Sequence, residues 1–535
     1  MTGPGPYRRA VNLATLLTQT ARRLPEADAV VRGAHRISWS TLDAAVSALA
    51  AALTARGLRP GDCVLVHSAN EIELVQTLFA VWRAGGVVAP TNARLTPADV
   101  AVIARVCRPA LVVCHDADRA HAAAVAEAVG PLRGAPLWIA GTGPDAVATV
   151  APLDGTGAPV PDAPVRNGDP AWYFFTSGTS GSPKCAVLTH DQMGFVVTNH
   201  IADLMPGLSA DDASLVLAPL SHGAGVHLLP QVARGARSVL TTAPGLDPAE
   251  AWELVERERI SNMFTVPTIL KKLAEHPDAR TRDHTALRHV VYAGAPMYAA
   301  DQAHARAVLG DVLVQYYGLG EVTGNITVLG PDEHDRPGPD GVEFGTCGRV
   351  RTGMAVVLRR PDGTETAPGE PGEVCVAGPA VCHGYLGNDE ANAAAFRDGW
   401  FHTGDIGVFD EHGYLFLTGR ISDMYISGGS NVHPRDVEEK LVAHPGVGEV
   451  AVLGMPHPSW GEVGVAVWVP ADGHEPGESE LREWLEPRIA RYKLPRHYVR
   501  WPELPRSGYG KIVKRTIRER LVDQGWTDGA PGGRS

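Results

Sequence analysis

The stretch FFTSGTSGSPKC, Phe174 to Cys185, sets five hydroxyl side chains around two glycines and ends shortly after a lysine. Gly178 and Gly181 can adopt backbone angles that are closed to other residues, so hydroxyls and main-chain N–H groups can surround an anion there. Lys184 adds a positive charge near the end of the stretch. Taken alone, the stretch is equally compatible with a phosphate-binding loop and with a polar surface turn.

The residues around this loop differ from those of the common P-loop. A P-loop has a lysine followed by serine or threonine, and the chain then continues into a helix. Here Pro183 precedes Lys184, and the strand-like run CAVLTH follows it. We therefore expect the loop to join two strands.

Outward from the loop, short apolar runs alternate with amphipathic helical runs such as PAEAWELVERERI. This alternation predicts an α/β fold with doubly wound, largely parallel sheets, whose ligands bind at loops after the carboxyl ends of strands. The runs short enough to be buried strands include DCVLVHS, LVLAPL, RSVLTT, NMFTVP, HVVYAG and VLVQYYG.

The later part of the chain has a different pattern. Between residues 343 and 419, Gly, Pro and Asp turns separate alternating strands, which predicts a small antiparallel, barrel-like section. Beyond it the sequence predicts a small α+β unit, with helices from HPRDVEEKLVAH and ESELREWLEPRIARY and strands from EVAVLGM and GVAVWVP. We expect a large N-terminal domain over residues 1–419 and a small C-terminal domain over residues 420–535, joined by a hinge.

Composition excludes several classes of function. The chain has 535 residues and a formal net charge of -12, which argues against a nucleic-acid partner. Its seven cysteines form no CxxC pair, which favours free thiols in a reduced cytoplasm over disulfides or a zinc site. No run reaches the length of a membrane span, and the N-terminus offers no export signal. We therefore expect a cytoplasmic protein.

Five motifs occur in a fixed order along the chain. Together they resemble the adenylate-forming superfamily, which includes acyl-CoA synthetases, aryl-CoA ligases, luciferases and the adenylation domains of peptide synthetases. The resemblance spans almost the whole chain, and so many ordered motifs are hard to obtain by chance. The motifs are FTSGTSGSPK at 175–184, YGLGE at 317–321, FHTGD at 401–405, GRISDMYISGG at 419–429 and PRSGYGKIVKR at 505–515.

The resemblance assigns most of these motifs to ATP. It implies that Glu321 holds Mg²⁺ against triphosphate oxygens, and that Asp405 and Arg420 bind the ribose. Tyr317 would stack on adenine, whereas Tyr316 would face the other way along the strand and belong to the core. The implied phosphate loop comprises Thr176, Ser177, Gly178, Thr179, Ser180, Gly181 and Lys184, and the remaining nucleotide contacts are Gly294, Ala295, Pro296 and Gly318.

The same resemblance implies an enzyme, an AMP-forming acid–thiol ligase with two half-reactions. Lys511, one of only seven lysines, would stabilise charge while an acid attacks the α-phosphorus of ATP and pyrophosphate leaves. The thiol of coenzyme A would then displace AMP, after the small domain has turned about residues 420–423. His222, in PLSHGAG, would contact the acid, although a packed loop histidine fits the sequence nearly as well.

Alternatives stay open for the acceptor and the acid. The acceptor could be an amine or a carrier-protein thiol, and the acid could be an unusual small oxyacid such as nitrite in a biosynthetic pathway. A nucleotide-binding protein without catalysis is a third possibility, but the retained Lys184, Glu321, Asp405, Arg420 and Lys511 weigh against it. The small and apolar residues expected around the acid favour a monocarboxylate, aromatic or medium aliphatic. A homodimer is also compatible with the resemblance.

Three positions depart from the family pattern. Gly320 stands where a threonine commonly contacts phosphate, Ser422 where the hinge often carries Asp or Lys, and Cys185 where a glycine usually follows the loop lysine. A neutral hydrogen bond is worth about 1 kcal/mol, so Gly320 predicts weaker nucleotide binding and not inactivity. We expect Cys185 to replace the glycine as a small residue and not to act as a nucleophile.

Overall fold

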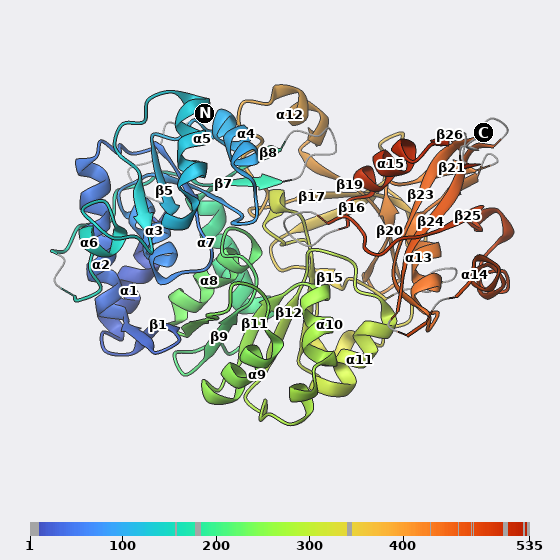
Figure 1. The fold of residues 1–535 in the computed structure, drawn as a ribbon, viewed down its shortest axis with the longest axis horizontal. Coiled ribbons are helices and arrows are strands. Elements are labelled where there is room, and N and C mark those ends of the chain that lie inside the picture. Colours follow the sequence, from blue (N-terminus) through green and yellow to red (C-terminus); the bar gives the residue numbers. More distant parts are fainter. Residues whose placement is uncertain are drawn as a thin grey trace.

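The computed structural model of the chain describes residues 10–155, 158–176, 183–339, 345–427, 430–457, 460–471, 473–474, 476–506, 512–527 and 530–531. Two large sheets and the helices around them form the N-terminal part, an antiparallel sheet follows, and a smaller unit ends the chain (Figure 1). This arrangement confirms the predicted fold class.

The larger N-terminal sheet has nine strands in the order β15-β14-β13-β12-β11-β9-β10-β1-β2. Its inner strands, β1 and β9 to β13, pair in parallel, and the strands at both edges are antiparallel. The bounds are β1 (Asp28–Arg32), β2 (His35–Ser38), β9 (Ala213–Val216), β10 (Arg237–Leu240), β11 (Asn262–Thr265), β12 (His289–Tyr292), β13 (Leu313–Tyr317), β14 (Thr327–Leu329) and β15 (Arg349–Val350).

The second sheet has six strands in the order β6-β5-β3-β4-β7-β8. All its pairs are parallel except that of β7 with β8. Every residue of β3 and β4 is buried, as expected for parallel strands covered on both faces. The bounds are β3 (Cys63–His67), β4 (Val87–Thr91), β5 (Leu111–His115), β6 (Leu137–Ile139), β7 (Pro170–Thr176) and β8 (Lys184–Thr189).

Helices pack between and around these sheets. In α3 every residue except Glu73 is buried, because this helix contacts β3 and β4 on one side and α1 and α2 on the other. The bounds are α1 (Ala14–Arg23), α2 (Trp39–Ala55), α3 (Ile72–Arg83), α4 (Pro97–Cys107), α5 (Arg119–Val129), α6 (Val147–Val150), α7 (His190–Asn199), α8 (Gly223–Arg234), α9 (Pro248–Arg257), α10 (Pro267–Glu275) and α11 (Ala299–Leu309). Shorter turns of helix are η1 (Asp116–Asp118), η2 (His200–Leu204), η3 (Pro277–Arg280), η4 (Gly320–Val322) and η5 (Pro331–Glu333).

A five-stranded antiparallel sheet follows, as the turn-rich sequence predicted. In it β19 pairs with β17, β18 and β20, so it is the central strand. The bounds are β16 (Ala355–Arg359), β17 (Gly372–Ala377), α12 (Asp389–Ala395), β18 (Phe396–Arg397), β19 (Trp400–Phe409) and β20 (Leu415–Arg420).

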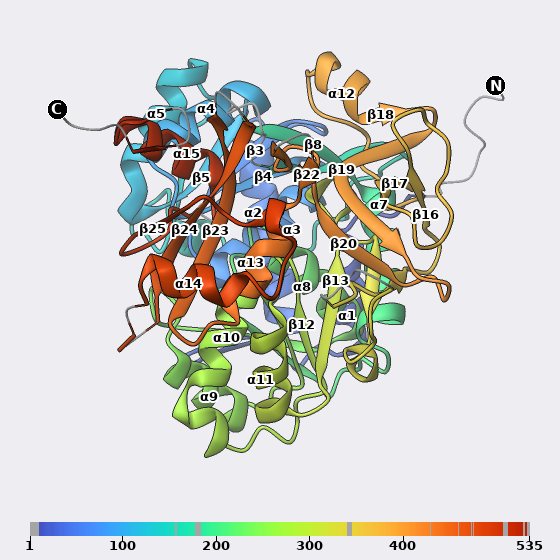
Figure 2. The same cartoon turned by 90° about the vertical axis from the view of Figure 1, so that its right-hand side faces the viewer.

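The C-terminal unit faces the viewer in Figure 2. Its helix α14 ends at Leu485, earlier than the sequence predicted, because Pro487 has no N–H with which to continue the helical hydrogen bonds. Helix α13 contacts the N-terminal part, where Arg435 Nη1 donates to the carbonyl of Leu417 at 3.0 Å. The bounds are β21 (Tyr425–Ser427), β22 (Ser430–Val432), α13 (Pro434–Val442), β23 (Val447–His457), β24 (Gly461–Pro470), α14 (Glu478–Leu485), η6 (Arg491–Lys493), β25 (His497–Arg500), α15 (Lys514–Asp523), β26 (Trp526–Thr527) and β27 (Ala530–Pro531).

Two further expectations concern the whole chain. All seven cysteines are buried free thiols. Within the described ranges, no helix combines the length and the apolar character that crossing a membrane requires.

Candidate functional site

The opening loop connects two antiparallel strands, as predicted. Thr176 is the last residue of β7, Lys184 is the first residue of β8, and the two residues pair directly across the strands. The predicted site residues Ser177, Gly178, Thr179, Ser180, Gly181 and Lys511 lie outside the described residues. The structure therefore describes both ends of the loop, and the site is built below from the residues around them.

Glu321 lies beside the first end of the loop. It follows β13, in the short helix η4, and only 5% of its surface is exposed. Thr176 Oγ1 donates to Glu321 Oε1 at 3.1 Å, and the Tyr385 hydroxyl donates to the same oxygen at 3.0 Å. Burial and the Glu321 carboxylate raise the pKa of Tyr385, so this hydroxyl keeps its proton and stays a donor.

Lys184 lies beside the same tyrosine at the other end of the loop. Its Nζ is 5.0 Å from the centre of the Tyr385 ring, within the range of a cation–π contact. The backbone of Tyr385 also forms an antiparallel bridge with Ala186 of β8. Tyr385 thus contacts both the predicted phosphate-binding lysine and the predicted metal-binding carboxylate, and it holds them on one side of the loop.

A second group of side chains surrounds Asp405, which is 5% exposed on β19. The Tyr317 hydroxyl donates to Asp405 Oδ2 at 2.6 Å, and Arg420 Nε donates to Oδ1 at 2.6 Å. Asp405 and Arg420 are paired residues of the adjacent strands β19 and β20. The Asp405 charge raises the pKa of Arg420, so the guanidinium stays charged.

Two loops after adjacent parallel strands flank these groups. Gly318 follows β13 and is closely packed. A Cβ there would lie 2.4 Å from Gly324 Cα, which excludes every other residue type. Gly294, Ala295 and Pro296 follow β12, and Gly294 has the left-handed φ of +87° that favours glycine. The predicted adenine-binding loops therefore lie side by side, at the carboxyl edge of the larger sheet.

His222 precedes α8 and contacts the same region through Phe174. Its Nδ1 donates to the carbonyl of Ser221 at 2.7 Å. The His222 and Phe174 ring centres are 4.5 Å apart. His227, by contrast, is buried and bonded to Asn262 Oδ1 at 3.0 Å, and burial lowers its pKa to about 4. His227 is therefore a neutral core histidine.

Aromatic rings lie next to the residues expected around the acid. Tyr316 is buried, as predicted, with its ring nearly parallel to that of Phe264 and 6.0 Å from it. A Cβ on Gly324 would lie 2.2 Å from the Tyr316 ring, and one on Gly223 would lie 2.7 Å from the Phe264 ring. Two glycines thus make room for two aromatic side chains.

A buried arginine behind Tyr316 was not expected from the sequence. Arg351 is 1% exposed, and its guanidinium donates to the Gly324 carbonyl at 3.3 Å and lies 3.7 Å from Asp203. Its charge is therefore already paired.

The three departures from the family pattern have different surroundings. A Cβ on Gly320 would lie 2.6 Å from the Phe174 ring, so the ring occupies the space that a threonine would need. Ser422 Oγ donates to Asp423 Oδ1 at 3.2 Å within the turn after β20. Cys185 is 1% exposed, and burial raises the pKa of its thiol. A protonated, inaccessible thiol agrees with the expectation that Cys185 is not a nucleophile.

Two known protein families match the sequence of this chain. Residues 17–386 match the family described as AMP-binding enzyme, and residues 436–511 match the AMP-binding enzyme C-terminal domain. The chain belongs to the AMP-binding enzyme family. The predicted resemblance is thereby confirmed.

Relatives of this AMP-binding enzyme match it over almost its full length. Feruloyl-CoA synthase of Amycolatopsis sp is 37% identical over 515 residues, which cover 96% of this chain and 100% of the relative. Indoleacetate–CoA ligase of Aromatoleum aromaticum is 33% identical and covers 94% of this chain and 95% of its own. The structure of the amide bond synthetase McbA from Marinactinospora thermotolerans superposes with a TM-score of 0.84 at 29% identity, covering 95% of this chain and 100% of that one.

Sequence reasoning missed two residues of the candidate site. Tyr385 lies between Gly384 and Gly387, whose φ angles of +114° and +60° favour glycine, and this pair of glycines was the available signal. Phe174 was quoted as part of the loop, but no pattern indicated that its ring would contact both His222 and the Gly320 position.

Proposed function

We propose that this AMP-binding enzyme activates a carboxylic acid with ATP to an acyl-adenylate, releasing pyrophosphate, and then transfers the acyl group to the thiol of coenzyme A. The observation that carries the proposal is the placement of two groups at the ends of one five-residue segment. Tyr317 begins the segment and bonds Asp405, and Glu321 ends it and bonds Thr176 and Tyr385. The ribose hydroxyls of a bound nucleotide would therefore meet the Asp405 carboxylate, and its phosphates would meet the group formed by Glu321, Thr176 and Tyr385.

In this proposal Asp405 accepts hydrogen bonds from the ribose hydroxyls, because its carboxylate is held in place by Arg420 and Tyr317. The Tyr317 ring and the loops at Gly294 and Gly318 contact the base. Lys184 and the hydroxyls from Thr176 onward contact the β- and γ-phosphates. His222 contacts the acid, because it precedes α8 and its ring lies against Phe174.

Magnesium fits the donor set at Glu321. Mg²⁺ prefers oxygen ligands and is commonly held by one or two carboxylates together with substrate phosphates. Glu321 is a buried carboxylate whose Oε1 is already fixed by two hydroxyl donors. When bound there, the ion would neutralise triphosphate charge, while Glu321, Thr176 and Tyr385 keep the carboxylate in one orientation.

The acceleration in this scheme comes from positioning and charge stabilisation. We propose that Lys511 reaches the acid and the α-phosphate during adenylation, and that the unit from residue 420 then turns about residues 420–423. The short turn after β20 supports a hinge there: Asp423 N and Met424 N both bond the Arg420 carbonyl. We propose residue 420 as the domain boundary.

For the acid we propose an aromatic monocarboxylate. The Phe174 ring lies against His222, and Phe264, which stacks on Tyr316, meets the neighbouring Gly223 position. Two relatives are named for the aromatic acids ferulate and indoleacetate. The one cation described behind this surface, Arg351, is occupied by Asp203 and the Gly324 carbonyl, so it does not pair a second carboxylate.

The test uses purified enzyme with MgATP and a panel of aromatic and aliphatic monocarboxylates, with and without coenzyme A. We expect AMP release to require both an aromatic acid and coenzyme A. Pyrophosphate formation that is indifferent to coenzyme A but stimulated by an amine would favour amide synthesis, the second candidate, which the match to an amide bond synthetase supports. Absence of both products with every acid would refute the proposal.

A further inference from the structure

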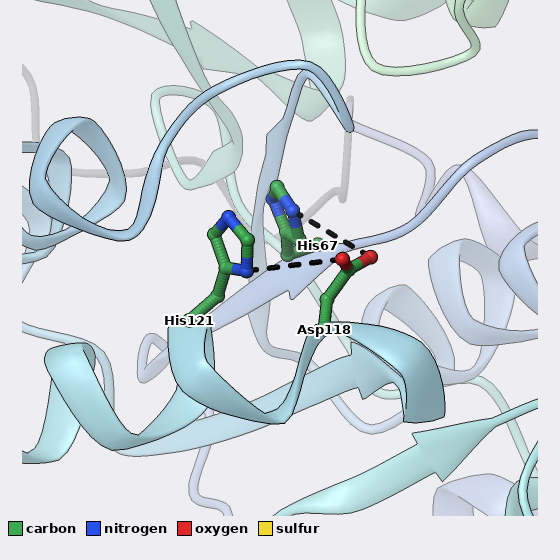
Figure 3. Close-up of side chains that lie close together, drawn as sticks. All are labelled: His67, Asp118 and His121. Atoms are coloured by element: carbon green, nitrogen blue, oxygen red, sulfur yellow. Dashed lines mark ion pairs between the residues drawn. The ribbon is translucent and has the colours of Figure 1, made fainter.

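A separate cluster of polar side chains lies at the carboxyl edge of the six-stranded sheet (Figure 3). His67 is the last residue of β3, Asp118 ends η1, and His121 lies in the first turn of α5. They meet because β3 and β5 are parallel neighbours, and η1 follows β5 directly. The His67 side chain is 0% exposed, that of His121 is 12% exposed and that of Asp118 is 30% exposed.

The hydrogen bonds of His67 determine which ring nitrogen carries the proton. To bind a metal, an imidazole must be neutral and carry a single N–H. The Thr91 hydroxyl donates to the carbonyl of Val66, so its oxygen accepts the 2.8 Å bond from His67 Nδ1. His67 Nε2 therefore carries a lone pair, and it is buried without a hydrogen-bond partner.

A hydrogen bond also determines which ring nitrogen of His121 carries a proton, and here it is Nε2. His121 Nε2 lies 2.9 Å from the carbonyl of Leu95, which can only accept, so Nε2 carries the proton. In a neutral, metal-binding ring His121 Nδ1 would then have the lone pair, and this nitrogen too is buried without a hydrogen-bond partner. Both orphan nitrogens face Asp118, since His67 Nε2 is 3.9 Å from Oδ2 and His121 Nδ1 is 3.9 Å from Oδ1.

Two imidazole nitrogens without a hydrogen-bond partner and one carboxylate thus lie within 4.8 Å of one another. Buried polar atoms without a partner are costly. The two rings are stacked, with their centres 4.2 Å apart and their planes 19° from parallel, so one ring must turn before both nitrogens can bond the same ion. A cation bonded to all three ligands would satisfy both nitrogens at once.

We propose that His67 Nε2, His121 Nδ1 and the Asp118 carboxylate bind a divalent transition-metal ion, with zinc as the best match. Zinc accepts imidazole nitrogen and carboxylate oxygen together, whereas magnesium selects oxygen ligands. The three ligand atoms lie within 4.8 Å of one another. Tetrahedral zinc with bonds of about 2.0–2.1 Å needs ligand atoms roughly 3.3 Å apart, so binding requires one of the two stacked rings to turn and the partly exposed Asp118 to move toward them.

A comparable cluster in the same chain shows why a neighbouring cation matters. Glu373, Cys375 and His402 also bring three potential metal ligands together. There, however, the Arg397 guanidinium lies 2.9 Å from His402 Nδ1 and 3.6 Å from Glu373 Oε2. That cluster already contains its positive charge, and no cationic side chain contacts the ring nitrogens of His67 or His121 among the described residues.

The position of the site suggests a structural role. A metal there would join the end of β3 to the start of α5. In the sheet, β4 separates β3 from β7, the strand that ends at Thr176. Since strands are about 4.8 Å apart, the metal would lie roughly 10 Å along the sheet edge from the phosphate loop. It would stiffen the edge that carries the nucleotide site without being part of it.

The test uses tag-free, full-length protein, first stripped with a chelator and then titrated with Co²⁺ and Zn²⁺ in the absence of nucleotide. We expect one Co²⁺ per chain with the visible absorption of a tetrahedral site, displacement by Zn²⁺, and a higher melting temperature with either ion. His121→Gln and Asp118→Asn should each weaken binding at least tenfold. The matched control is His412→Gln, because His412 is exposed beside a single carboxylate, Glu411, and should bind as the wild type does.

Thr91→Val tests the tautomer argument separately. It keeps all three ligands but removes the acceptor that orients His67, and loss of such an outer partner typically costs 10- to 100-fold in metal affinity. Wild-type protein that binds no more Co²⁺ or Zn²⁺ than His121→Gln or Asp118→Asn would overturn the proposal. If these variants fail to fold, labelling of wild-type His121 by diethyl pyrocarbonate decides: zinc should protect this ring, and equal labelling with and without zinc would also overturn it.

Discussion

Tyr385→Phe is the sharpest test of how Glu321 is positioned. The substitution removes only the hydroxyl that donates to Glu321 Oε1 at 3.0 Å, and it retains the ring beside Lys184. A hydrogen bond to a charged group contributes about 1.5–3 kcal/mol, and each 1.36 kcal/mol corresponds to a factor of ten in rate. We therefore expect kcat/KM for MgATP in acid-dependent pyrophosphate release to fall about 10- to 150-fold.

The matched control is Tyr414→Phe. The Tyr414 hydroxyl also donates to a glutamate, Glu333 Oε1 at 2.5 Å, but it does so at the turn before β20 and away from the loop. Both variants lose one tyrosine–carboxylate bond, so their melting temperatures should fall by similar amounts. Only Tyr385→Phe should lose activity. Unchanged kcat/KM in Tyr385→Phe, or an equal loss in Tyr414→Phe, would refute the reasoning.

Three further outcomes follow from the same contacts. Asp405→Asn should weaken ATP binding at least about tenfold in calorimetry, because it removes the charge that pairs with Arg420; unchanged affinity would contradict the ribose role. Gly320→Thr should lower the free energy of unfolding by about 1–3 kcal/mol in urea, since its Cβ would meet the Phe174 ring; a stable variant with tighter ATP binding would show that the ring can move. Stability should be complete above about pH 6.5 and decline toward pH 4, because the unfolded state binds protons that the fold excludes; an equal urea midpoint at pH 7 and pH 5 would count against this. The histidines responsible, each with a pKa lowered to about 4 by burial, are His190, His227 and His289.

The fold was predictable because its signals are local. Fully buried parallel strands such as β3 appear in the sequence as continuous apolar runs, and the turn-rich region before Arg420 could only be antiparallel. The main error in secondary structure was the length of α14, where a helical pattern of side chains continued past a proline that ended the backbone bonds.

The site was predictable as a set of residues but not as a set of contacts. The structure brings Glu321 to Thr176 and Asp405 to Arg420, although only the first motif follows the end of a strand and the second lies within β19. The hydroxyl bond from Tyr317 to Asp405 joins residues 88 positions apart, and no local pattern contains such a pairing. The cluster of His67, Asp118 and His121 was missed for the same reason, since its ligands come from separate segments that only the packing of β3 against β5 unites.

The two bonds at the ends of residues 317–321 have a mechanical consequence. Tyr317 bonds Asp405 on β19, and Glu321 bonds Tyr385 in the connection between β17 and α12, so both partners belong to the antiparallel section. A nucleotide that contacts Asp405 and the phosphate loop must therefore span the boundary between that section and the six-stranded sheet, because the loop joins β7 and β8 of that sheet. Both hydrogen bonds involve residues 317–321. A displacement of the antiparallel section would therefore disturb the ribose contacts and the phosphate contacts together. In the proposed cycle, ATP binding should accordingly fix the position of the antiparallel section relative to the six-stranded sheet before the C-terminal unit turns.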